Sequence, residues 1–313
     1  MTGSIPSSSL ASAPGTPGAE ASVVTPRRRV GRALRPALAV APFLVYAFLG
    51  LGIPILAVVD YAFRDPAGHL TMANINLVAH GNNGSYLLGF KNSIILASIT
   101  SVVPGVLGVV LAYTIHTSRS GLLRRLVATA SGVLANFGGI NLTFMFIATL
   151  GSTGLLTVWL SFVHVNLAGL GFNLYSFYGV VVVYMYFQVP LMVLVITPAL
   201  SGLRASWREA AANMGASPWR YWRHVGAPVL APSVLGGMLL LFGSSFAAYA
   251  TAETLTAGTV TLAPIQIGNL LAGNAISGQV NVGYAIGFGM FLVLSVTMIL
   301  YGLVQRRASK WLR

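Results

Sequence analysis

Six long apolar runs constrain this chain more than any other feature. Asp60 is the only Asp, Glu, Lys or Arg inside them, and the runs occupy residues 37–60, 92–116, 126–150, 177–200, 229–251 and 283–304. Each run holds about 22–25 residues, or about 33–37 Å as a helix, which is enough to cross about 30 Å of hydrocarbon with some tilt. We therefore expect an all-α integral membrane protein with six transmembrane helices.

The composition supports this class and argues against others. Charged residues make up 7% of the chain, whereas a soluble domain carries roughly 25%. The net charge of +13 does not indicate nucleic-acid binding, because the basic residues form short clusters between apolar runs and make no basic stripe. The chain has no cysteine, which excludes disulfides, and its histidines lack metal-ligand spacing, so we expect no metal site.

The distribution of Lys and Arg orients the six spans. Of the 18 such residues, only Arg64 and Lys91 fall on one side of a six-span topology. The rest lie in the N-terminal segment, in the loops at 117–125 and 201–228, and at the C-terminus. The positive-inside rule therefore predicts that both termini of this multi-pass protein are cytoplasmic, with the six spans in contact with lipid.

Composition also divides the chain. Residues 1–26 are rich in Ser, Ala, Pro and Gly, a composition that buries too little apolar surface to offset the entropy of ordering. We expect residues 1–36 to be a disordered cytoplasmic tail ending in a basic cluster, residues 37–304 to be one transmembrane domain, and residues 305–313 to be a short basic cytoplasmic end. Between the third and fourth spans, residues 151–176 predict a short helix at the outer interface or a re-entrant segment.

The loop between spans four and five, 201–228, has the most informative local pattern. Ser206 and Glu209 have the spacing of a capping box and predict the start of a short helix. Gly215 suits the left-handed position just past its end.

A second short helix follows in the same loop. Ser217 and Pro218 are typical of an N-cap and a first helical position. Pro228 predicts the end of this second helix.

The same loop resembles the signature of the inner-membrane components of binding-protein-dependent ABC importers. That signature reads Glu-Ala-Ala, three residues, Gly, nine residues, Ile-x-Leu-Pro, and this chain departs from it at Val225 and Ala227. The matching positions are Glu209, Ala210, Ala211, Gly215 and Pro228.

The resemblance implies a type I ABC importer permease, with this loop as the coupling helices that dock in a cytoplasmic ABC ATPase dimer. Trp207 and Trp219 are expected to anchor that interface. The other implied partners are a second permease, as a homologue or a second copy, and an extracytoplasmic substrate-binding protein. The resemblance also implies that the protein lies in the bacterial plasma membrane. The alternative for Glu209 is a purely local capping role, and the alternative for the loop arginines is retention in the cytoplasm by charge.

Two further stretches resemble one branch of the family. Residues 245–258 are similar to permeases for spermidine/putrescine, ferric iron, thiamine, sulfate or molybdate, and aminoethylphosphonate. Residues 262–267 look most like the polyamine-type permeases. The resemblance implies a polyamine or a related small charged solute as the cargo.

A few polar residues at or near membrane depth are candidates for lining the translocation path. Their alternative role is hydrogen bonding between helices, or, for the acid, an exposed loop position. The candidates are Asn136, Asn141, Tyr184, Gln188, Tyr249 and Glu253.

The sequence offers no catalytic group. A phosphate-binding loop of the Gly-x4-Gly-Lys-Ser/Thr type is absent, so we expect no enzyme activity and no cofactor in this chain, with ATP bound by a partner subunit. The competing interpretations are a secondary transporter without an ATPase, a non-transporting membrane scaffold and, remotely, an intramembrane hydrolase. The absence of mid-membrane charges disfavours the first.

Overall fold

The computed structural model describes residues 40–81, 84–165, 167, 169–272 and 279–311, and side chains up to residue 306. The expected disordered tail, 1–36, lies outside the described residues. The helices after the π-turn η1 (Phe48–Gly52) are α2 (Ile53–Ala62), α3 (Ala73–His80), α4 (Ser85–Thr117), α5 (Gly121–Asn136), α6 (Gly139–Leu150), α7 (Leu155–Phe162), α8 (Phe177–Ser201), α9 (Ala205–Asn213), α10 (Pro218–Tyr221), the π-turn η3 (Trp222–Gly226), α11 (Ala227–Ala247), α12 (Ala250–Thr256), α13 (Ala263–Leu271) and α14 (Val280–Trp311).

The prediction of an all-α chain with six spans is confirmed. Within the described ranges no strand forms beyond one isolated bridge between Arg64 and Leu70. Six helical stretches are long and apolar enough to cross a membrane, at Val40–Ala62, Ser85–Thr117, Gly139–Phe162, Phe177–Ser201, Pro218–Ala247 and Val280–Arg306.

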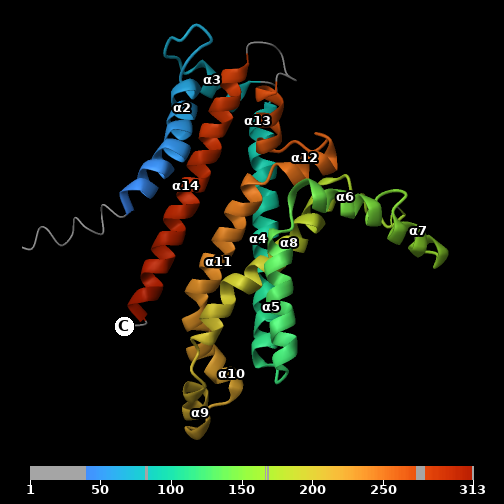
Figure 1. The fold of residues 1–313 in the computed structure, drawn as a ribbon, viewed down its shortest axis with the longest axis vertical. Helices are drawn as coiled ribbons and strands as arrows, with labels where there is room; N and C mark the ends of the chain where they lie inside the picture. Colours follow the sequence, from blue (N-terminus) through green and yellow to red (C-terminus); the bar gives the residue numbers. More distant parts are fainter. Residues whose placement is uncertain (1–39, 82–83, 166, 168, 273–278, 312–313) are drawn as a thin grey trace, which may run out of the picture. The chain divides into compact units, whose positions relative to one another are not determined.

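The chain divides into two compact units, residues 1–53 and 54–313. The described part of the first unit, residues 40–53, is helical and includes η1. In the second unit α8 packs against α4, α5 and α11, and α11 also packs against α14 (Figure 1). Lipid tails are as apolar as leucine, so packing contacts and interhelical hydrogen bonds hold such helices together.

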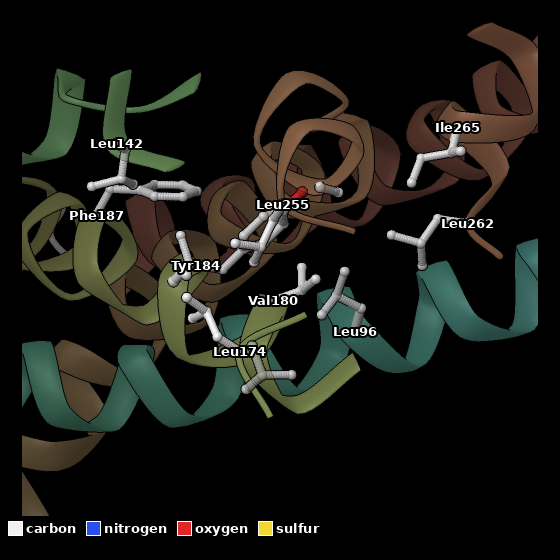
Figure 2. Close-up of a cluster of buried hydrophobic side chains, with 12 residues drawn as sticks. Leu96, Leu142, Leu174, Val180, Tyr184, Phe187, Leu255, Leu262 and Ile265 are labelled. Carbon is white, nitrogen blue, oxygen red and sulfur yellow. The ribbon is translucent and has the colours of Figure 1, made fainter. Parts of the chain in front are cut away.

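The main buried cluster gathers around α8. Val180, Val183 and Tyr184 are fully buried there. Figure 2 shows Tyr184 beside Leu255 of α12, with Leu96 of α4 facing the same cluster. The cluster thus ties α12 to α4 and α8.

A glycine sets the distance between α4 and α8. A Cβ atom at Gly108 would lie 2.5 Å from Met192 Cβ and 3.0 Å from the Val189 carbonyl oxygen. Real Cβ atoms do not approach that closely, so Gly108 is the residue that lets these two backbones meet.

The span expected at 126–150 is not one continuous helix, because the pair Gly138 and Gly139, which could either unwind it or only allow tight packing, unwinds it. The helix breaks at Phe137 and Gly138, and Gly139 begins α6 with a φ of 72°. Glycine costs a helix about 1 kcal/mol relative to alanine, and the freed Gly139 N–H donates to Thr251 Oγ1 at 3.0 Å. The short helix expected within residues 151–176 is present as α7. It forms the end of the stretch Gly139–Phe162, the third that is long and apolar enough to cross a membrane, and its position at the membrane interface stays a prediction.

The segment between α2 and α3 folds on side-chain hydrogen bonds. Asn74 Nδ2 donates to the Arg64 carbonyl at 2.7 Å, and Asn281 Nδ2 donates to the same oxygen at 2.8 Å. The backbone N–H of His69 donates to Asp65 Oδ1 at 2.8 Å and holds the pKa of that carboxyl below its usual value. These bonds tie the segment to the start of α14.

Candidate functional site

The first helix of the loop, α9, begins two residues earlier than expected. Arg204 is its N-cap and makes no side-chain cap bond, so the capping box predicted for Ser206 and Glu209 is wrong. Both side chains lie inside α9 and are exposed. Glu209 therefore has no role in starting the helix, which removes the local explanation for its carboxylate.

The predicted left-handed corner after α9 is confirmed. Gly215 has a φ of 75°, and the Ala216 N–H donates to the Ala211 carbonyl at 2.9 Å while the Gly215 N–H donates to that of Ala212 at 2.9 Å. This pair of bonds is a Schellman motif, which satisfies the last carbonyls of a helix and requires a residue that tolerates positive φ. The corner is therefore a hydrogen-bonded unit rather than a loose turn.

The start of the second helix is also confirmed, but its end is not. Ser217 Oγ accepts the Arg220 N–H at 3.3 Å, and Pro218 is the first residue of α10. Pro228 does not end this helix, because α10, η3 and α11 follow one another without a break. The Ala227 N–H donates to the Trp222 carbonyl, five residues back instead of the four of an α-helix. This π-helical turn accommodates Pro228, which has no N–H to donate.

Large apolar side chains are exposed at the tip of the loop. Met214 is 81% exposed and Trp219 is 74% exposed. Glu209 and Ala210 are exposed beside them, while Ala211 is buried. We call Glu209, Ala210, Met214, Gly215 and Trp219 the loop tip.

Aromatic packing fixes the base of the loop to the bundle. Tyr221 is 7% exposed, and the Trp222 ring meets Tyr113 of α4 edge-on at 4.9 Å. Trp207 is half-buried. A cavity of about 280 Å³ lies between these elements and is lined in part by Arg204 and Arg208. The base of the loop is thus held against α4 through ring contacts.

Two of the candidate path residues are buried in bonds between α8 and α11. Tyr184 OH donates to the Ala248 carbonyl at 2.9 Å. Gln188 Nε2 donates to the Leu241 carbonyl at 2.9 Å and also to Ser245 Oγ. Thr100 Oγ1 donates to the same Ser245 Oγ at 2.8 Å. Sequence reasoning missed Thr100 and Ser245 as partners, because single hydroxyls in apolar runs carry no spacing that pairs them.

The Tyr184 hydrogen bond gives a small-effect prediction. Tyr184→Phe keeps the buried ring and removes one interhelical bond, so the free energy of unfolding should fall by about 0.6 kcal/mol. Thermal unfolding of the purified chain in one detergent measures this. A fall of several kcal/mol would show that the hydroxyl does more than hold α8 to α11.

The other four candidates lie around one contact between α6 and α12. The bond from Gly139 N to Thr251 Oγ1 joins the two stretches, and Thr143 Oγ1 donates to the Thr251 carbonyl at 3.3 Å. Asn136, Asn141 and Tyr249 are exposed, and Glu253 is partly exposed. Asn136 and Asn141 flank Gly139, and Tyr249 and Glu253 flank Thr251.

A family model described as "Binding-protein-dependent transport system inner membrane component" matches residues 105–310. The match covers about two thirds of the chain and includes α9, the Gly215 corner and α11. The chain belongs to this family. The resemblance drawn from the loop signature is thereby confirmed.

Relatives in the family carry different names. The "Spermidine/putrescine transport system permease protein PotC homolog" of Mycoplasma pneumoniae is 27% identical over 167 residues, 52% of each chain. The "Molybdenum transport system permease protein ModB" of Mycobacterium tuberculosis is 28% identical over 165 residues, 52% of this chain and 59% of the relative. The chain thus spans about half the length of the curated relatives it matches.

A solved structure has the same fold. A chain of the bacterial alginate ABC transporter in complex with alginate pentasaccharide-bound periplasmic protein aligns with a TM-score of 0.66 at 16% identity, over 90% of this chain and 98% of that chain. At this identity the likeness concerns architecture alone.

Proposed function

We propose that this chain is the permease subunit of an ATP-driven ABC importer, with the loop tip docked on a cytoplasmic ATPase dimer. The observation that carries the proposal is the hydrogen-bonded corner at Gly215, which presents Met214 and Trp219 to solvent. Exposed aromatic and Met side chains are typical anchors of protein interfaces. ATP is bound and hydrolysed by the ATPase, so this chain needs no cofactor and is not itself an enzyme.

In the proposed mechanism the ATPases draw the two loop tips together, and the bundles move between inward-open and outward-open states. A second permease, as a homologue or a second copy, forms the other half of the path. An extracytoplasmic binding protein delivers the solute, and the alginate transporter, which was solved in complex with a periplasmic protein, supports such an assembly. We further propose that the protein lies in the bacterial plasma membrane with both termini cytoplasmic.

We assign the six candidate polar residues to two roles. Tyr184 and Gln188 hold α8 to α11, since both are buried and engaged. The path follows Asn136, Asn141, Tyr249 and Glu253, which are exposed or partly exposed around one interhelical contact. A secondary transporter is the competing function, and it requires no ATPase at the loop tip.

The absence of cysteine makes a direct test simple. In the cysteine-free chain, Met214→Cys provides a single thiol at the loop tip for a maleimide-linked photocrosslinker. We expect a crosslinked partner whose peptides contain Gly-x4-Gly-Lys-Ser/Thr, and we expect labelling of intact cells to require permeabilisation. Leu70→Cys, at a residue 79% exposed in the segment between α2 and α3, is the matched control that should label from outside and capture no ATPase.

Two outcomes would contradict the proposal. Labelling of Met214→Cys in intact cells would reverse the topology. Labelling from inside without any crosslinked ATPase, in membranes where solute uptake depends on the chain, would favour the secondary transporter.

A further inference from the structure

A carboxylate without a partner lies on α12. Glu253 Oε2 is buried and makes no hydrogen bond in the described part of the chain. The residue as a whole is partly exposed. One carboxylate oxygen is therefore shielded from solvent, while the rest of the side chain stays accessible to a ligand. A desolvated charge without a partner is costly and is retained where something else supplies the counter-charge.

No cation of the described residues supplies it. The ion pairs found there, Arg64 with Asp60 and His69 with Asp65, both belong to the end of α2 and the segment after it. Apart from the Thr157 hydroxyl, the other buried side-chain atoms without a partner in the described ranges are the Gln188 and Gln266 carbonyl oxygens, which are acceptors too. Within the described residues, what Glu253 Oε2 lacks is therefore a hydrogen-bond donor.

An aromatic ring lies one helical turn before the carboxylate. Tyr249 and Glu253 are four residues apart and share a face at the start of α12, where the Glu253 N–H bonds to the Tyr249 carbonyl at 2.9 Å. The ring lies against α13, since a Cβ on Gly268 would meet Tyr249 Cε2 at 2.7 Å. Tyr249 is 42% exposed, so part of its surface is free for a ligand.

The opposite face of α12 holds this pair in place. Ala252 and Leu255 are buried in the main cluster, where Leu255 lies next to Tyr184 (Figure 2). Thr251 bonds to Gly139. A carboxylate and a ring on a helix fixed from behind keep their relative geometry when a ligand arrives, which is the condition for selective binding.

The chemistry of the pair identifies the ligand class. A carboxylate binds an ammonium group through charge-assisted hydrogen bonds, and a Tyr ring attracts the same cation through its face. A protein metal site needs several ligand side chains, and no group of three His, Cys, Asp or Glu residues gathers in the part of the chain that is described. An oxyanion such as molybdate would be repelled by the carboxylate.

We propose that Glu253 and Tyr249 bind a primary ammonium group of the transported solute, so that the cargo is an organic amine cation of the polyamine type. This inference rests on the proposed function as a permease, and it separates the chain from relatives that are named for sulfate or molybdenum.

The test uses Glu253→Gln in the full chain, expressed in its own host from which the chromosomal copy has been deleted. Radiolabelled spermidine and putrescine are the probes, with molybdate as the oxyanion probe. We expect amine uptake to fall by about 30-fold or more, because one partner of a buried charge pair is removed. Asp60→Asn, which removes an acid from an exposed ion pair, is the charge-matched control and should transport normally.

ATPase co-purification separates this inference from the function on which it rests. We expect Glu253→Gln to retain the ATPase and lose amine uptake. If the ATPase co-purifies and the variant takes up both amines like the wild type, the ammonium site is wrong and the permease function stands. Uptake of molybdate that depends on the chain, without dependence of either amine, would equally overturn the inference. If no ATPase co-purifies with the wild type, the proposed function itself fails.

Discussion

Replacing Gly215 with Asp should leave the chain in the membrane at normal abundance and abolish its association with an ATPase. Gly215 has a φ of 75°, and a Cβ added there would have no atom within 4 Å, so the bundle has no clash to absorb. The cost is local, since a left-handed backbone is unfavourable by about 1–2 kcal/mol for a residue with a Cβ. The added carboxylate would also stand in the surface proposed to dock.

Co-purification of the ATPase and solute uptake, both normalised to membrane abundance, measure this effect. Gly68→Asp is the matched control, because Gly68 has a φ of 91°, equally open surroundings and a place in the segment between α2 and α3. The Gly68→Asp variant should still co-purify with the ATPase. Full association and uptake with Gly215→Asp would remove the basis for the coupling role of the loop.

Replacing Gly108 with Leu should instead destroy the bundle. The new Cβ would meet Met192 Cβ at 2.5 Å and the Val189 carbonyl oxygen at 3.0 Å, and the rest of the side chain has no space. Overpacking of this kind costs about 1–3 kcal/mol even where side chains yield, and here the obstacles are a Cβ and a backbone atom. We expect strongly reduced membrane abundance and a lower unfolding temperature in detergent.

The matched control for that change is Gly302→Leu. Gly302 lies in α14 and has nothing within 4 Å of an added Cβ, so a leucine there should be tolerated. Equal abundance and equal unfolding temperatures for the two variants would show that α4 and α8 do not meet as closely as described.

Local chemistry determined what was predictable from the sequence. The apolar runs predicted six spans, and Gly215, Ser217 and Pro218 predicted the turn and the second helix start, because positive φ, a capping hydroxyl and a missing N–H act on their nearest neighbours. Each of these features is confirmed.

The failures arose where a distant or competing partner decided the outcome. The break at Gly138 and Gly139 is stabilised by Thr251, which lies 112 residues further along the chain from Gly139. Pro228 is accommodated by the π-turn η3 instead of ending a helix. The unpartnered state of Glu253 depends on the packing of α12, which no spacing in the sequence reveals.

The unbroken helix from the loop to the outer part of the bundle has a mechanical consequence. Pro218–Ala247 comprises 30 residues, or about 45 Å at 1.5 Å per residue. If this stretch pivots as a rigid rod near its loop end, a tilt of about 5° displaces its other end by about 4 Å, given a length of about 45 Å. The far end leads directly into Tyr249 and Glu253, so a small stroke at the proposed ATPase interface would be enough to shift the proposed ammonium site.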